Sequence, residues 1–503
     1  MKKLLSVVLI TLMCFSLAAC GNNSAKTDPA GDNTENTGKQ DPAEGETTEL
    51  VWAIKTWGTT PADMDKVEDA INAYLIDKLN IKVSILPIGI ADWTEKMNVM
   101  LTSPNEPLDL VAMSGDQFAS YVSKGQIIAL DDLLAEYGPS ITEVLGDFLS
   151  AGQSNGVQYA VPTIKDEAGG TGFLILQDAV DKYNIDLSSV TSLPAIEPIL
   201  AALKAAEPNI YPLALAKVIS TVTLSMNYDP LGNDFGVLMD VVNGGNVVNL
   251  FETDEYADYC KLMRKWYLAG YIAPDAATIE DNNSTQLKAG TAIAQTSKTK
   301  PGLVDEQSTI IGKKVANVEY RKPIATTSTV QSAMWGIANN STHPKEAMQL
   351  LELLYSDEYL INLICNGIEG VHYVKNADGT LSYPEGISAE TSPYNLNMSW
   401  EMGNQYLSYI WEGTDPTLYQ QLKEFNETAI KSIALGFVFD QSKVATEVSA
   451  CTSVVSQYKL ALETGSVDTD TVLPEFIEKL KRAGIDTIIS EKQSQLDAWL
   501  AAK

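Results

Sequence analysis

Histidine and cysteine are scarce in this chain, and their scarcity limits the chemistry that the protein can perform. The 503 residues include two histidines, His343 and His372, and five cysteines. Cys260, Cys365 and Cys451 lie beyond the first twenty residues and form no C-x-x-C pair. So few imidazole and thiolate ligands argue against a zinc site, and neither a metal nor a cofactor is predicted. One disulfide stays open as an alternative, but three buried free thiols fit the wide spacing better.

Other signatures are missing as well. The sequence contains no G-x-x-x-x-G-K-[ST] loop, no G-x-G-x-x-G turn and no H-E-x-x-H motif, which argues against a nucleotide site and a zinc protease. Basic residues number 35 against 65 acidic ones, giving a net charge of -30. Such an anion disfavours nucleic acid or an anionic lipid surface as a partner, and we interpret the charge as a source of solubility.

The first twenty residues have the pattern of a secretory leader. Lys2 and Lys3 precede an apolar run that ends in Leu17-Ala-Ala-Cys20. The run is shorter than the roughly 20 apolar residues that span a bilayer, so residues 1–19 are predicted to be a signal peptide. The final tetrapeptide resembles a bacterial lipobox, which implies lipidation of Cys20; an ordinary leader with a chance cysteine is the alternative. Residues 21–49 lack large apolar side chains, so residues 20–49 are predicted to be the lipidated cysteine and a disordered tether.

Beyond the tether, strand and helix patterns alternate. Strands are predicted at 50–54, 81–85 and 108–113, where apolar residues run together or alternate. Thr60 and Pro61 predict the start of the first intervening helix, and Asp92 with Glu95 predicts a capping box for the second. This alternation is typical of an open α/β sheet.

The second half of the chain returns to strand patterns and then becomes mostly helical. Strand character recurs at 289–296 and 332–338, and Pro344 begins a long amphipathic helix. One apolar stripe near the C-terminus comprises Val444, Val448, Cys451, Val455, Tyr458 and Leu462. We therefore expect a helical C-terminal region after the last strand.

Several phrases carry a resemblance to a known family. They are LDLVAMSG at 108–115, IIALDDLL at 127–134, GTAIA at 290–294 and AMWGIA at 333–338. Together with the leader, they resemble family 1 of the bacterial extracellular solute-binding proteins, the sugar-binding class of ABC importers. Longer phrases at 367–373, 379–386, 400–406 and 474–485 are similar to LipO/LplA-type lipoproteins.

The resemblance implies an α/β, two-lobe periplasmic-binding-protein-like fold of type II, with hinge crossings and a helical C-terminal region. Crossings are expected near 161–163, 294–297 and 336–340. Lobe 1 would then comprise 50–162 plus 295–338, and lobe 2 would comprise 163–294 plus 339–503.

A sugar site needs flat aromatic side chains as platforms and fixed polar groups for hydroxyls, and in an open α/β sheet it lies at the carboxyl ends of strands. The candidate ligand-binding residues chosen on this basis are Trp57, Ser114, Gly115, Asp116, Lys165, Asp166, Tyr228, Trp335, Glu369, His372, Tyr373 and Trp400. For some of them a structural role is the alternative: Asp116 could cap a helix, and His372 could be a satisfied interior residue.

The sequence therefore predicts a binding protein rather than an enzyme. It would capture a carbohydrate, expected to be an oligosaccharide, between two lobes and deliver it to the permease subunits of an ABC importer. We expect a monomer, anchored by lipid on the extracellular face of the cell membrane, that binds no nucleic acid. The alternatives are a secreted glycoside-active enzyme, which would need two facing carboxylates, and a surface adhesin.

Overall fold

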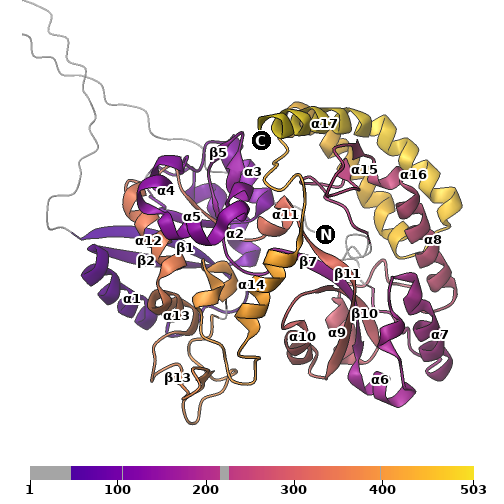
Figure 1. The fold of residues 1–503 in the computed structure, drawn as a ribbon, viewed down its shortest axis with the longest axis horizontal. Helices are drawn as coiled ribbons and strands as arrows, with labels where there is room; N and C mark the ends of the chain where they lie inside the picture. The colour runs from indigo at the N-terminus through magenta and orange to yellow at the C-terminus, as the bar shows by residue number, and fades with distance from the viewer. Residues whose placement is uncertain (1–46, 105, 216–225, 397) are drawn as a thin grey trace, which may run out of the picture. The chain divides into compact units, whose positions relative to one another are not determined.

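The computed structural model describes residues 47–104, 106–215, 226–396 and 398–503, all within one compact unit, Ala43–Lys503. The predicted signal peptide, Cys20 and the tether up to residue 46 lie outside these residues. Two larger β-sheets, each beside its own hydrophobic core, organise the described chain (Figure 1). The mixture of sheets and surrounding helices confirms the predicted α/β class.

The first sheet carries the N-terminal strands. Its order is β2 (Ile81–Gly89), β1 (Thr48–Thr56), β3 (Leu110–Met113), β12 (Met334–Ile337) and β6 (Val161–Pro162). β1 runs parallel to β2 and β3, whereas β12 runs antiparallel to β3 and β6. Successive residues of β1, Trp52, Ala53 and Ile54, are all fully buried, as expected for a strand covered on both faces. The strands predicted at 50–54, 81–85, 108–113 and 332–338 are confirmed.

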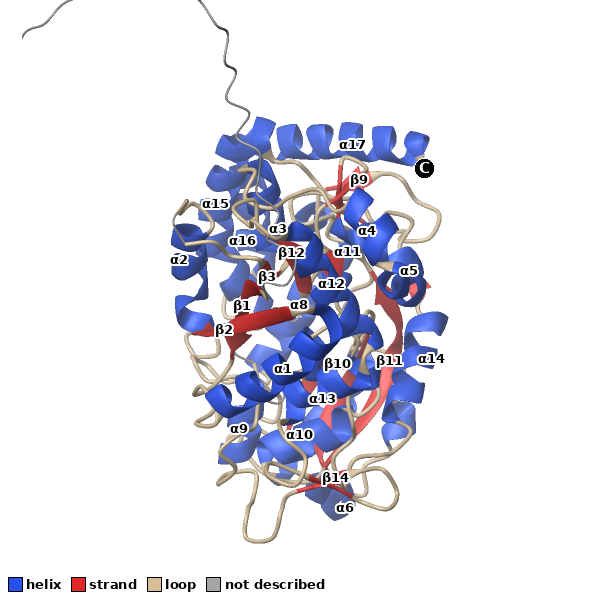
Figure 2. Cartoon of the chain, turned by 90° about the vertical axis from the view of Figure 1, so that its left-hand side faces the viewer, coloured by secondary structure: helices blue, strands red, loops and turns tan. Residues whose placement is uncertain are grey.

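Helices cover this sheet and share its core (Figure 2). They are α1 (Met64–Leu79), α2 (Ile90–Met100), α3 (Gly115–Ser123), α4 (Asp131–Tyr137), α5 (Pro139–Leu145), α12 (Pro344–Ser356) and α13 (Glu358–Asn366). The helix predicted to continue from Pro344 is interrupted at Asp357, whose carboxylate accepts the Leu360 N–H at 2.9 Å and caps a new helix.

Two predicted helix starts are wrong. α1 begins at Met64 rather than near Thr60, because Asp63 is held in a turn by its N–H bond to the carbonyl of Pro393 at 3.1 Å. α2 begins at Ile90, directly after β2 ends at Gly89, so Asp92 lies inside the first turn and cannot cap it. In both cases a contact with a distant segment determines where the helix begins: Pro393 for α1, and β1, which pairs with β2, for α2.

The second sheet has the order β10 (Ala294–Thr299), β7 (Gly169–Leu176), β11 (Val315–Ala325) and β15 (Ile430–Lys431). The helices around it are α6 (Gln177–Tyr183), α7 (Glu197–Ala206), α8 (Asp254–Leu268), α9 (Asn283–Ala289), α10 (Leu303–Ile311), α15 (Ala445–Glu463), α16 (Thr469–Ala483) and α17 (Ile485–Ala502). The last three confirm the predicted helical C-terminal region, which Figure 1 draws in yellow. None of the described helices is long and apolar enough to cross a membrane.

Short elements complete the described chain. They are α11 (Thr327–Val330), α14 (Leu418–Thr428) and the strand pairs β4 (Gln153–Ser154) with β5 (Val157–Gln158), β8 (Val237–Leu238) with β9 (Val247–Val248), and β13 (Val374–Lys375) with β14 (Leu381–Ser382).

Within the described residues, the chain passes between the two sheets at three places. It runs from β6 to β7 through 163–168, from β11 to β12 through 326–333, and from α14 to β15 around Ala429. Only the first agrees with the predicted crossings. The segment 294–297 belongs to β10, which pairs with β7, and Gly336 lies inside β12.

Two segments lie elsewhere than the predicted division into lobes implies. The strands at 294–299 and 315–325 join the second sheet, and many buried residues between Ala347 and Met402 pack in the first core. Membership depends on which distant strand a segment pairs with, and a local apolar pattern does not carry that information.

Candidate functional site

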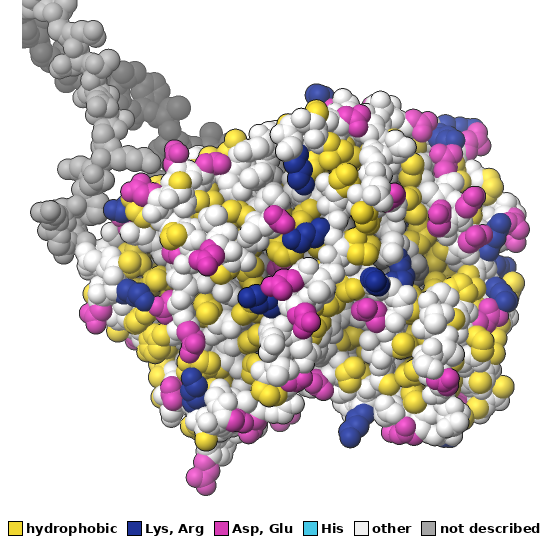
Figure 3. Space-filling view, viewed as in Figure 1, with side chains coloured by type: hydrophobic (Ala, Val, Ile, Leu, Met, Phe, Trp, Pro, Cys, Tyr) yellow, Lys and Arg dark blue, Asp and Glu magenta, His cyan; other side chains and the backbone are white. Residues whose placement is uncertain are grey.

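A cavity of about 1270 Å³ is lined by residues from both cores and from the crossing segments. Its walls include the segment after β6, the start of β7, the end of β10 with α10, the α11 region and the 3-10 turn Ser399–Glu401. Figure 3 shows the face on which the surface is indented between the two halves of the unit. A concave site of this size with both polar and apolar walls is suited to a small-molecule ligand.

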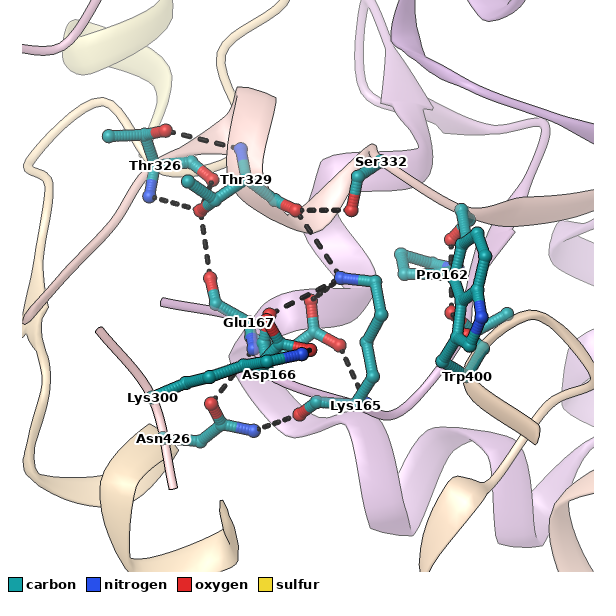
Figure 4. Close-up of polar contacts among 12 residues, drawn as sticks. Pro162, Lys165, Asp166, Glu167, Lys300, Thr326, Thr329, Ser332, Trp400 and Asn426 are labelled. Carbon is teal, nitrogen blue, oxygen red and sulfur yellow. Dashed lines mark hydrogen bonds and ion pairs between the residues drawn. The ribbon is translucent and has the colours of Figure 1, made fainter. Parts of the chain in front are cut away.

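Hydrogen bonds fix the first crossing segment beside the cavity. The Thr163 hydroxyl donates to the carbonyl of Trp400 at 2.9 Å. Asn426 of α14 donates to the carbonyl of Lys165 at 2.5 Å and accepts the Glu167 N–H at 2.9 Å. Segments from three parts of the chain thus meet where the chain leaves the first sheet, and they define the orientation of the cavity wall (Figure 4).

A charged cluster lies on this wall. Lys165 is 4% exposed and Glu167 fully buried; the Lys165 N–H donates to Glu167 Oε1 at 3.0 Å and its ammonium lies 3.6 Å from Oε2. Burial raises the pKa of Glu167 to about 7, although the neighbouring Lys165 opposes the shift. Lys300 lies 3.7 Å from Asp166 and 3.1 Å from Glu306, so both signs of charge are present along one edge (Figure 4).

Glycines shape the neighbouring part of the cavity. A Cβ at Gly170 would lie 2.2 Å from the Thr299 hydroxyl oxygen, so β10 can approach β7 this closely only because residue 170 is glycine. The approach places Lys298 and Lys300, from the end of β10 and the residue after it, in the cavity lining.

Trp400 supplies an aromatic face to the cavity. It is half-buried, and its ring centroid lies 5.9 Å from that of Trp57, which is 58% exposed and does not line the cavity. Glu401, the next residue, holds the turn that carries Trp400 in place. Its side chain forms a buried ion pair with Lys55 at 3.0 Å, and its carbonyl accepts the Trp335 Nε1–H at 2.8 Å.

Tyr228 also lines the cavity. Its side chain is 7% exposed, and its hydroxyl donates to Asp234 at 3.1 Å. Burial and the Asp234 charge raise the pKa of Tyr228, so the hydroxyl keeps its proton. Of the candidate residues chosen from the sequence, the structure therefore places Lys165, Asp166, Tyr228 and Trp400 around one cavity.

The other candidates lie elsewhere. Ser114 and Gly115 form the start of α3, where the Ser114 N–H donates to the Gln117 side chain at 3.0 Å in a capping box. Asp116 lies in the same turn, but its side chain is outside the described part of the structure. None of these side chains appears in the described cavity lining.

Placing Trp335, His372 and Tyr373 at the cleft was wrong. Trp335 has no exposed surface and packs edge-on against Trp52 at 6.0 Å in the first core. His372 is also fully buried and accepts the Ile368 N–H through Nδ1 at 2.9 Å. Tyr373 is 5% exposed and lines no part of the cavity, and Glu369 beside it is exposed to solvent.

Sequence reasoning missed Lys298, Lys300, Thr329 and Gln405, which all line the cavity. Residues 297–301, Ser-Lys-Thr-Lys-Pro, follow directly on a strand pattern. The rule that ligands bind beyond strand ends could have found the two lysines. Thr329 and Gln405 give no local signal, because the long-range packing of the crossings brings them there.

The described residues form no cluster of metal ligands: no group of His, Cys, Asp or Glu among them could hold a metal ion. The spacing G-x-S-x-G does occur at 152–156, which the sequence reading overlooked, but it falls in the β4–β5 hairpin rather than at the strand-to-helix turn of a nucleophile elbow. Cys260, Cys365 and Cys451 are all buried as free thiols.

Comparison with known proteins gives the family. The family described as bacterial extracellular solute-binding protein matches residues 69–364. A carbohydrate ABC transporter substrate-binding protein of Streptococcus pneumoniae serotype 4 is 30% identical over 98% of this chain and 97% of that protein. This chain belongs to the bacterial extracellular solute-binding proteins. A domain of unknown function, DUF3502, matches residues 433–501, which include α15–α17.

Solved structures agree with the assignment. The N-glycan transport solute-binding protein NgtS of S. pneumoniae is 28% identical, covers 90% of this chain and 99% of its own, and has a TM-score of 0.80. The structure of NgtS in complex with Man1GlcNAc is 27% identical, covers 90% of this chain and 100% of its own, and has a TM-score of 0.72. The complex with Man5GlcNAc is 28% identical, covers 90% of this chain and 99% of its own, and has a TM-score of 0.69. The chain therefore has the two-lobe fold of solute-binding proteins.

Family membership confirms two functional predictions. The protein is a solute-binding protein of bacteria that acts outside the cytoplasm. It is not an enzyme, because its family binds solutes for transport and performs no chemistry on them.

Proposed function

We propose that this protein binds an oligosaccharide of the N-glycan type in the cavity and delivers it to the permease of an ABC importer. The observation that supports this ligand class is the cavity itself, whose lining combines Trp400 with charged and hydroxyl side chains that include Lys165, Asp166 and Thr329. A sugar ring offers C–H faces to an aromatic platform and hydroxyls to such donors and acceptors. NgtS, which shares the fold over most of both chains, binds Man1GlcNAc and Man5GlcNAc.

We propose that the first sheet with its core forms one lobe and the second sheet with its core forms the other. The crossings at 163–168, 326–333 and near Ala429 would then act as the hinge. A sugar that contacts both lobes binds the closed form better, and it shifts the equilibrium by that difference in affinity. The TM-scores to the NgtS complexes with Man1GlcNAc and Man5GlcNAc, 0.72 and 0.69, are lower than the 0.80 to the other NgtS structure, which supports movement of this kind.

Calorimetry with Man1GlcNAc and Man5GlcNAc tests the ligand class. We expect saturable binding to the wild type and at least about tenfold weaker binding to Trp400→Ala, because the aromatic platform is lost. Tyr137→Ala is the control, since Tyr137 is also a half-buried aromatic residue but lies on α4 outside the cavity lining, and it should bind like the wild type.

The alternatives make different predictions. Chromatography of the recovered sugar should show it unchanged; cleaved products would instead indicate a glycoside-active enzyme. If no oligosaccharide binds and the protein attaches to an immobilised polymer, the adhesin alternative would replace the transport function. Sedimentation analysis should show a monomer with and without sugar.

We also propose a lipid anchor at Cys20, supported by the lipobox-like sequence and the polar segment after it. In bacteria that express the full chain, a palmitate analogue should label the wild type but not Cys20→Ser. Cys14→Ser is the control and should stay labelled, because Cys14 lies within the leader that would be removed. Labelling of Cys20→Ser would refute the anchor without affecting the sugar assignment.

A further inference from the structure

The segment from Tyr228 to Leu238 forms both a cavity wall and a tight internal turn. Tyr228 and Pro230 line the cavity. Asp229 and Leu238 exchange backbone hydrogen bonds at 2.8 and 2.9 Å, which closes the turn at its base. Its tip contains Leu231 at a φ of +49°, a conformation that a leucine rarely adopts without support from its surroundings.

That support comes from α17. Lys492 has no exposed surface and reaches into the turn from the C-terminal helix. Its ammonium donates to the Gly236 carbonyl at 2.8 Å, to the Asn233 side chain at 2.9 Å and to the Asn233 carbonyl at 3.1 Å. A single buried amino group thus donates hydrogen bonds to a segment about 260 residues earlier in the chain.

A second contact comes from α15. The Lys459 ammonium lies 2.7 Å from Asp234 Oδ2, while Asp234 Oδ1 accepts the Tyr228 hydroxyl at 3.1 Å. The Lys459 side chain is 18% exposed and that of Asp234 is 22% exposed, so water screens this pair only partly. A continuous path of polar contacts therefore leads from α15 through Asp234 to an aromatic ring in the cavity wall.

We infer that helices α15 and α17, both in the region matched by DUF3502, position the Tyr228–Pro230 wall of the cavity and thereby set its affinity for sugars. Lys459 and Lys492 act as positioning residues in this arrangement, because they hold the wall through Asp234 and the 230–236 turn. The inference rests on the proposed sugar-binding function.

The central test is a double-mutant cycle between Lys459→Met and Tyr228→Phe, read by calorimetry with Man5GlcNAc. We expect Lys459→Met to weaken binding about tenfold in the wild-type background, and to have little further effect once the Tyr228 hydroxyl is absent. Lys459→Arg should restore most of the affinity, because a guanidinium can still pair with Asp234. Lys265→Met is the matched control: Lys265 lies on α8 outside the cavity lining, pairs with Glu197 at 2.6 Å, and should leave affinity unchanged.

A readout without ligand separates the two proposals. In the free protein, hydrogen exchange at the Asp229 and Leu238 amides should accelerate in Lys459→Met and Lys492→Met but not in Lys265→Met. If the wild type binds no oligosaccharide but exchange accelerates as expected, the sugar function fails while the positioning role stands. Unchanged exchange, or an equal loss of affinity from Lys459→Met with and without the Tyr228 hydroxyl, would overturn the inference.

Discussion

Replacing Lys55 by methionine should destabilise the protein strongly, because it would leave the Glu401 carboxylate buried without its cation. The ammonium lies 3.0 Å from Glu401 Oε1, and the two side chains are 4% and 2% exposed. Glu401 Oε2 has no hydrogen-bond partner among the described residues, so Lys55 is the main compensation for the buried charge.

The size of the effect follows from this geometry. Two unit charges at that distance attract by about 5 kcal/mol at an effective dielectric constant of about 20. Removing one member of a buried pair costs about 3–5 kcal/mol, whereas replacing both by apolar residues is often neutral or stabilising. We therefore expect Lys55→Met to lose about 3–5 kcal/mol of unfolding free energy, and Lys55→Met/Glu401→Leu to recover most of it.

Urea unfolding followed by circular dichroism would measure these differences. Lys66→Met is the control, because Lys66 pairs with Asp63 at 2.8 Å with its own side chain 64% exposed, and its loss should cost no more than about 1 kcal/mol. The reasoning is refuted if Lys55→Met resembles Lys66→Met. It is equally refuted if the double variant is as unstable as Lys55→Met alone, since the cost would then arise from packing rather than from a stranded charge.

Further predictions concern the crossing region and one glycine. The pKa of Glu167 is about 7 in the folded protein against an ordinary value of 4.5, so folding favours its protonated form. The unfolding free energy of the wild type, relative to that of Glu167→Gln, should therefore fall by about 3 kcal/mol as the pH rises from about 4 to about 8. Unfolding free energies of both proteins across that range check this, and parallel pH profiles would contradict it. Gly403→Ala should cost about 3 kcal/mol or more, because residue 403 has a φ of +121° and the new Cβ would lie 2.4 Å from the carbonyl oxygen of Leu354. Gly413→Ala, at a φ of +86° with nothing within 4 Å, isolates the backbone cost and should lose about 1 kcal/mol; equal losses at both positions would show that the contact with Leu354 does not matter.

Local patterns predicted the elements of the fold well but not their partners. The strands at 50–54 and 81–85 could be predicted because their apolar patterns are visible in the sequence without knowing which strands they pair with. The placement of 294–297 failed because β10 joins the second sheet through β7, whose glycines allow the close approach. No short-range feature of the sequence around 294 indicates that partner.

For the candidate site, too, local sequence patterns identified some residues, whereas long-range contacts decided the position of others. Lys165 and Asp166 were found because they directly follow a predicted crossing. Trp335 was misplaced because its burial depends on contacts with Trp52 and with the carbonyl of Glu401, both far away in the sequence. An aromatic residue near a strand end has the same local appearance whether it faces a ligand or the interior.

The separation of the hydrophobic interior into two main clusters has a consequence for heat denaturation. Each cluster packs mainly within itself, so we expect the two to unfold as separate cooperative units. Thermal unfolding of the free protein should then give two overlapping calorimetric peaks. Under the proposed function, a sugar bound between the two sheets couples their unfolding, so saturation should merge the peaks into one sharper transition at a higher temperature.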